Sequence, residues 1–94
     1  MVDVEYKDVK SGAYLINESG NVWSNLTNKF MRPTKDKDGY LKLELRTNNG
    51  SHCSVRIATL VLWSFDGPPP EDMKDPTANH IDSNKLNNHI SNLE

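Results

Sequence analysis

The stretch of sequence that decides the fold is Tyr40-Leu41-Lys42-Leu43-Glu44-Leu45. Its three leucines alternate with a lysine and a glutamate, so an extended strand would carry one apolar face and one charged face. Turn sequences lie on both sides of it, at 36–39 and 47–51, and the segment 52–56 follows the second turn. Two strands joined by such a turn form a hairpin. We therefore expect residues 40–45 and 52–56 to pair as antiparallel strands.

Shorter apolar segments precede this hairpin. Residues 14–16 and 22–23 are separated by a polar stretch that contains Gly20-Asn21, two residues that tolerate the positive φ of a tight turn. This pattern is typical of a strand, a turn and a second strand. The sequence thus predicts a small antiparallel sheet made from residues 13–56.

The period of the apolar residues changes after this sheet. Apolar side chains recur three, four and eight residues after Ile57, which predicts a short amphipathic helix over 57–65. Gly67 and three prolines end it, since proline cannot continue a helix. The predicted fold class is α+β, with Leu41, Leu43 and Leu45 facing the apolar side of the helix. The helix residues expected in this core are Ile57, Leu60, Val61 and Phe65.

Length and composition restrict the class of protein. A chain of 94 residues fits one small domain, and its mean hydropathy of −0.72 leaves no apolar run of the roughly 18 residues that a membrane span needs. The first five residues lack the basic and apolar stretches of a secretion signal. Cys53 is the single cysteine, which excludes an internal disulfide and a zinc site built from several cysteines. We expect a protein of the reducing cytoplasm, with no membrane partner and no zinc.

Charge is unevenly distributed along the chain. The net charge is −2, but residues 21–60 hold seven Lys and Arg against three acidic residues, whereas residues 61–94 hold two Lys against six. If the protein binds DNA, electrostatic attraction favours the middle segment. The alternative is an ordinary solvated face of a sheet. The candidate DNA-binding residues are Lys29, Arg32, Lys35, Lys37 and Arg46.

The last sixteen residues carry the most specific pattern. Asn79 and His80 lie side by side, an asparagine-rich stretch follows, and Asn92 comes twelve residues after the histidine. Histidine is the commonest general base because its pKa lies near neutral pH. An asparagine side-chain oxygen is a hard, neutral ligand that suits Mg²⁺ or Mn²⁺.

This pattern closely resembles the HNH nuclease motif in the form carried by phage and intron-encoded homing endonucleases. The sequence before it resembles the small modular domain that precedes HNH motifs in those enzymes and assists DNA binding there. Its matching segments are 14–24, 39–43 and 57–70, so the two resemblances cover nearly the whole chain. They imply a modular domain at 1–66, a proline-rich acidic connector at 67–78 and a partial HNH motif of the ββα-metal type at 79–94.

The resemblance also implies an activity and roles for individual residues. It implies an endonuclease that hydrolyses double-stranded DNA with Mg²⁺ or Mn²⁺. His80 matches the general base, Asn79 matches a metal ligand that is often aspartate in the family, and Asn92 matches the central asparagine that fixes the loop and helps to orient the base. A plain turn cap is the alternative role for Asn92.

One departure from the family bears on activity. In the family, the second strand of the motif continues and a helix with a further metal ligand follows, and neither comes after Glu94. The expectation is either a piece of a longer nuclease or a naturally shortened form. An inactive DNA-binding module that keeps the nuclease scaffold is therefore the second interpretation.

The remaining polar and aromatic residues are interpreted as structural. Asn84, Asn87 and Asn88 are expected to hold the loop through local hydrogen bonds, because asparagine side chains bond readily to nearby backbone. Lys85 is expected to be solvated, although contact with a phosphate is possible for it. His52 and His89 are not expected to bind metal, and Trp23 and Trp63 are expected in the core.

Overall fold

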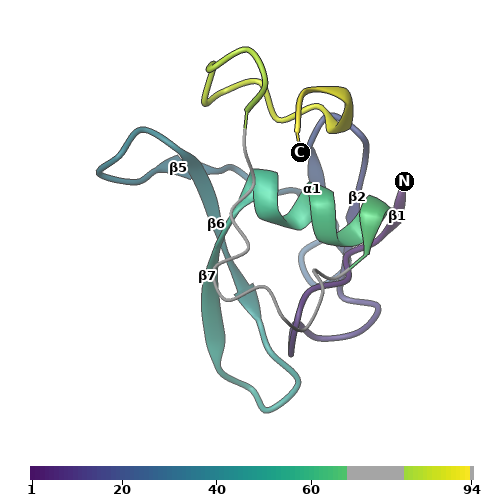
Figure 1. Cartoon of the computed structure of the whole chain (residues 1–94). Helices are drawn as coiled ribbons and strands as arrows, with labels where there is room; N and C mark the ends of the chain where they lie inside the picture. Colours follow the sequence, from purple (N-terminus) through teal and green to yellow (C-terminus); the bar gives the residue numbers. More distant parts are fainter. Residues whose placement is uncertain (68–79, 94) are drawn as a thin grey trace.

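The computed structural model describes residues 1–67 and 80–93, and it contains two small antiparallel sheets and one α-helix (Figure 1). The first sheet has four short strands in sequence order: β1 (Val2–Asp3), β2 (Tyr14–Ile16), β3 (Val22–Ser24) and β4 (Lys29–Phe30). The second has three: β5 (Thr34–Lys35), β6 (Leu41–Arg46) and β7 (His52–Arg56). The α+β class predicted from the sequence is confirmed.

The hairpin of β6 and β7 is the longest strand pair. Leu43 lies opposite Val55 and Leu45 opposite Cys53, as antiparallel partners. Leu43 and Leu45 are buried, whereas Glu44 between them is exposed, so the alternation in the sequence becomes the two faces of the strand. The expected pairing of 40–45 with 52–56 is confirmed.

The strands divide into two sheets, where the sequence suggested one. The break falls between β4 and β5, at Met31-Arg32-Pro33. Pro33 has no backbone N–H to donate to a neighbouring strand, so sheet pairing is interrupted at this point. The three shortest strands, β1, β4 and β5, were also not predicted, because two residues carry too little pattern to show in a sequence.

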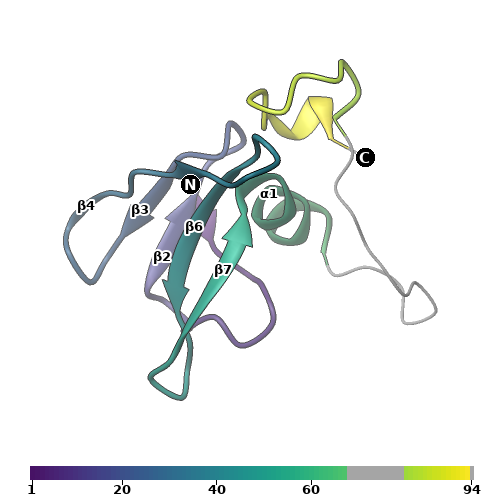
Figure 2. The ribbon, with the colours of Figure 1, turned by 90° about the vertical axis from the view of Figure 1, so that its left-hand side faces the viewer.

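Helix α1 (Ile57–Asp66) begins directly after β7 and matches the predicted helix within one residue. Arg56 precedes it in an extended conformation, and Gly67 follows it at φ +83°, with its N–H donating to the carbonyl of Trp63. A positive φ is the usual glycine conformation at a helix end. Figure 2 shows the helix beside the sheets, close to the end of β7 and away from the arrowhead of β6.

The core lies between the helix and the sheets. Leu60, Val61, Ile57 and Ala58 of the helix are buried against both sheets, whereas Phe65 is only partly buried. The largest fully buried side chains are Ile16, Val22, Leu45, Leu60 and Val61. The expected packing of the alternating leucines on the helix is confirmed for Leu43 and Leu45 and is weaker for Leu41, which is half-buried.

The two tryptophans lie at the margins of the core and are half-buried, although the sequence placed them inside. Trp23 packs edge-on against Phe30 with ring centroids 5.1 Å apart, and Trp63 packs in the same way against Tyr6 at 4.8 Å. Tryptophan is large enough that full burial is rare in a core this small.

Residues 80–93 form a loop that lies alongside α1, above the helix in Figure 1. It ends in a short 3₁₀ turn, η1 (Ile90–Asn92), and Leu93 joins the main core. Most of the expected connector, 67–78, lies outside the described residues. Within 1–67 and 80–93, no helix has the length and apolar character needed to cross a membrane.

Candidate functional site

His80 lies at the start of the loop, where the chain turns back on itself. It forms an isolated antiparallel bridge with Leu93, and the N–H of Ile81 donates to the carbonyl of Asn92 at 2.8 Å. The imidazole is half-buried, and its Nε2 lies 2.8 Å from Oδ1 of Asn88. The bridge therefore gives His80 a fixed backbone, and Asn88 gives its ring a hydrogen-bonding partner.

Asn92, the last residue of η1, closes the loop from its other end. Its Nδ2 donates to Oδ1 of Asp82 and to the carbonyl of Asn87, both at 2.9 Å, and its Oδ1 accepts from the N–H of Asp82 at 3.1 Å. The side chain is 8% exposed. All of these bonds fix the loop, and the imidazole of His80 bonds to Asn88 instead.

Asp82 is the centre of the loop's hydrogen bonds. Its carboxylate accepts from the N–H of Asn84 at 2.8 Å, from the amide of Asn87 at 3.1 Å and from the amide of Asn92. These donors, with the Asn84 N–H the strongest, hold the pKa of Asp82 below its ordinary value. Ser83, at φ +63°, makes the tight turn after Asp82.

The loop also contacts the turn between β2 and β3. The N–H of Ile90 donates to the carbonyl of Glu18 at 2.8 Å, and Asn88, 6% exposed, packs over Gly20. A Cβ at Gly20 would come within 2.6 Å of Cγ2 of Ile57 and 3.3 Å of the Cβ of Asn88. Only glycine leaves enough space for this close approach, and its φ of +88° also favours glycine.

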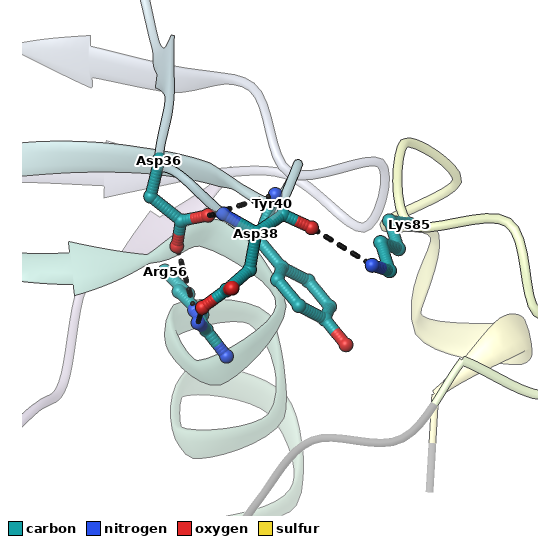
Figure 3. A network of polar contacts seen from close by, with 5 residues as sticks. All are labelled: Asp36, Asp38, Tyr40, Arg56 and Lys85. Atoms are coloured by element: carbon teal, nitrogen blue, oxygen red, sulfur yellow. Dashed lines mark hydrogen bonds and ion pairs between the residues drawn. The ribbon is translucent and has the colours of Figure 1, made fainter.

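On the other side of the site, a network of polar contacts surrounds the turn between β5 and β6 (Figure 3). Oδ1 of Asp36 accepts from the N–H groups of Asp38 and Tyr40, and its Oδ2 pairs with Nε of Arg56 at 2.9 Å. Partial burial raises the pKa of Asp36, but these hydrogen bonds and the guanidinium outweigh it, so the pKa lies below its ordinary value. Arg56 also pairs with Asp38 at 3.4 Å.

Tyr40 connects this network to His80. The Arg56 guanidinium lies 4.0 Å and the Lys85 ammonium 4.8 Å from the centroid of its ring, and the ring of His80 lies 5.8 Å away at an angle of 34°. Lys85 also donates to the carbonyl of Asp38 at 2.8 Å, as Figure 3 shows. Lys85 is exposed, as the sequence suggested, and its ammonium also has a definite partner across the site.

The candidate DNA-binding residues are all exposed but do not form one cluster. Lys29 and Arg32 line the same surface depression beside Phe30, whose side chain is 55% exposed. Lys35 lies in β5, and Lys37 lies in the turn that follows it. Arg46 lies at the far end of β6 from that turn, opposite His52. Arg56, in contrast, is already paired with carboxylates.

No group of three or more His, Cys, Asp or Glu side chains within the described residues is placed to hold a metal ion. Asn79, the expected metal ligand, lies outside the described residues. The residues that the structure does describe therefore supply a positioned histidine and a hydrogen-bonded loop, but not a metal centre by themselves.

Asn88 and Tyr40 are the site residues that the sequence did not single out. Asn88 was interpreted as one of several loop asparagines, and its contact with His80 depends on the close approach at Gly20. Tyr40 was assigned only to a strand. No local signal in the sequence distinguishes either residue, because the Tyr40 contact and the approach of Asn88 to Gly20 both join distant parts of the chain.

Comparisons with known proteins agree with this architecture. The chain is 42% identical over 81 residues to an uncharacterised HNH endonuclease of Acanthamoeba polyphaga mimivirus, a match that covers 86% of this chain and 23% of that protein. The fold is similar to the HNH homing endonuclease I-HmuI, in a structure described as DNA binding and cleavage, with a TM-score of 0.73 and 30% identity. That match covers 95% of this chain and 50% of the other. No family model matches.

These matches make the chain a homologue of the HNH endonucleases and confirm the resemblance seen in the sequence. In fold it is similar to a homing endonuclease of that class. The chain spans about a quarter of the viral relative and half of the structural one.

Proposed function

We propose that this chain is the part of an HNH homing-type endonuclease that binds double-stranded DNA and supplies the general base for phosphodiester hydrolysis. His80 is the base, and Asn92 fixes the loop on which it is held. The observation that carries the proposal is the half-buried His80, fixed by a strand bridge and a 2.8 Å hydrogen bond within a chain homologous to HNH endonucleases.

The residues of this chain have distinct tasks in the proposed reaction. The imidazole of His80 removes a proton from the attacking water and keeps that proton until the products leave. The bonds of Asn92 to Asp82 and Asn87 keep the strand that carries His80 in register with Leu93. A bound Mg²⁺ or Mn²⁺, with Asn79 as one ligand, would stabilise negative charge at the phosphate.

Substitution of the base tests this proposal. His80→Ala in the full-length gene product should lower single-turnover cleavage of plasmid DNA by about 10²–10⁴-fold in Mg²⁺ or Mn²⁺. His52→Ala is the matched control, because His52 is the exposed first residue of β7, opposite Arg46. Equal rates for His80→Ala and the unaltered protein would remove His80 from the mechanism. DNA binding with no cleavage by the unaltered protein would favour the inactive binding module.

The exposed basic residues are proposed to contact the phosphates of double-stranded DNA. Each phosphate that a Lys or Arg neutralises adds about 0.9 to the slope of log affinity against log salt concentration. Ala substitutions of the five exposed candidates should therefore reduce both affinity and slope in fluorescence-anisotropy titrations. Lys7→Ala is the matched charge control. Unchanged affinity and slope would place the interface elsewhere. The five residues are Lys29, Arg32, Lys35, Lys37 and Arg46.

A further inference from the structure

We propose that Asn88 is the residue that positions His80, by accepting a hydrogen bond from Nε2–H and so leaving Nδ1 as the nitrogen that takes the proton from water. This inference rests on the proposed role of His80 as the base. Asn88 does not touch the reacting atoms, so it is a positioning residue. Its role is separate from that of Asn92, whose hydrogen bonds go to the loop.

The chemistry of the contact assigns the tautomer. A neutral imidazole has one N–H donor and one acceptor nitrogen. The atom that faces Nε2 of His80 at 2.8 Å is Oδ1 of Asn88, and an amide oxygen can only accept. Nε2 therefore carries the proton, and the lone pair is on Nδ1. In other hydrolases too, a partner group binds one ring nitrogen of the general-base histidine, and the opposite nitrogen takes the proton.

Asn88 is well placed for this task because it is fixed to the body of the protein. Its side chain is 6% exposed and lies over Gly20, in the gap beside Ile57 that only a glycine leaves open. The chain that follows Asn88 is anchored by the bond from Ile90 to Glu18. The amide is therefore positioned by the sheet and the helix as well as by its own loop.

Tyr40 provides a second contact with the imidazole. Its ring, with Arg56 and Lys85 over it, lies 5.8 Å from that of His80 at an angle of 34°, within the range of interacting aromatic rings. Asn88 fixes a ring nitrogen, whereas Tyr40 packs against the ring and limits its rotation. Together they hold the imidazole in one orientation.

Cleavage kinetics give the first test. Asn88→Ala should lower the single-turnover rate constant about 10–100-fold, the usual effect of losing a group that orients a functional histidine, while DNA affinity stays the same. Asn88→Asp has nearly the same shape and keeps an acceptor oxygen, so it should retain most of the rate. Asn84→Ala is the control, since Asn84 is an exposed residue of the same loop whose side chain, among the described residues, bonds only to the N–H of Leu86.

The outcomes separate positioning from a merely structural role. Equal losses of rate in Asn88→Ala and Asn88→Asp, or a loss of DNA affinity that accounts for the slower rate, would overturn the proposal. If Asn88→Ala fails to fold, as judged by circular dichroism, the comparison of Asn88→Asp with the unaltered protein decides. A rate for Asn88→Asp that falls by 10-fold or more would then count against the proposal.

A second measurement needs neither a substitution nor activity. Long-range ¹H–¹⁵N NMR of the 94-residue chain, at an alkaline pH where imidazoles are neutral, reports which nitrogen of His80 carries the proton. We expect protonated Nε2 and unprotonated Nδ1. The opposite tautomer would overturn the assignment even if His80 is the base. Conversely, His80→Ala with full activity would refute the proposed function and leave the hydrogen bond to Asn88 as a structural contact.

Discussion

The two described parts of the chain are stabilised in different ways. Residues 1–67 pack around apolar side chains such as Ile16, Leu45 and Leu60, each of which has no exposed surface. Residues 80–93 bury one residue in that core, Leu93, with Ile90 packed against it, and are otherwise held by hydrogen bonds from the backbone and from Asn and Asp side chains. Burial of apolar groups gives stability, whereas directional hydrogen bonds give a defined geometry. His80 lies in the part where geometry matters more.

The largest expected effect on stability comes from a substitution in the apolar core of residues 1–67. Leu45→Ala should destabilise the whole fold by about 2–5 kcal/mol, because it removes a fully buried side chain and leaves a cavity. Urea unfolding followed by tryptophan fluorescence measures it. Leu26→Ala, at a leucine that is 45% exposed, is the control and should change the free energy of unfolding by less than about 0.5 kcal/mol. Similar effects for the two would contradict the assigned core.

Gly20 lies where the two parts meet. Gly20→Ala should cost about 1–3 kcal/mol through overpacking, because the new Cβ would clash with Ile57 and press on Asn88. Gly12→Ala is a close control, since Gly12 has a similar φ of +73° but no atom within 4 Å of a Cβ. Thermal unfolding of both variants separates packing from backbone strain. Equal losses of stability in the two variants would mean that the close approach of Gly20 to Ile57 and Asn88 does not limit the residue at this position.

A smaller effect is expected from the loop alone. Asn92→Ala removes the three hydrogen bonds that Asn92 makes within the loop and should cost about 1–2 kcal/mol, because the freed groups are partly compensated by water. Hydrogen exchange should accelerate at the N–H of Asp82 and not in β6. Faster exchange throughout β6 would show that the loop and the sheets unfold together.

The smallest effect is a pH dependence of the loop. The pKa of Asp82 lies below its ordinary value of 3.8, so its contribution to stability is present above pH 3.8 and is lost as the pH falls through the depressed value. NMR shifts of the amide groups of Asn84, Asn87 and Asn92 should therefore change at acidic pH. Asp82→Asn should abolish this change. A transition centred above pH 3.8 would contradict the sign of the pKa shift.

The two parts also differ in how far their structure can be predicted from the sequence. The alternation in 40–45 and the spacing after Ile57 predicted the hairpin and the helix, because the period of apolar residues reports burial directly. The separation into two sheets was not predicted, since it depends on how the short strands pair. In the site, the resemblance singled out His80 and Asn92, and both lie in one compact loop.

Contacts between distant residues were the part that the sequence could not show. The roles of Asn88 and Tyr40 depend on Gly20, on Arg56 and on the turn at Asp38, and none of these is a neighbour of His80 in sequence. The same applies to Lys85, whose partner is a backbone carbonyl. Polar side chains on a loop follow no periodic pattern in the sequence, so the sequence does not identify their partners.

The hydrogen bond between Ile90 and Glu18 has a consequence for the order of folding. Hairpins such as β6–β7 close over a few residues, whereas this bond joins residues 18 and 90, which are far apart in the sequence, and costs more entropy to form. The loop with the histidine should therefore be the last part to assemble, on a surface that is already built. Transplanting this loop into another protein would require that surface as well, including a glycine where Gly20 lies.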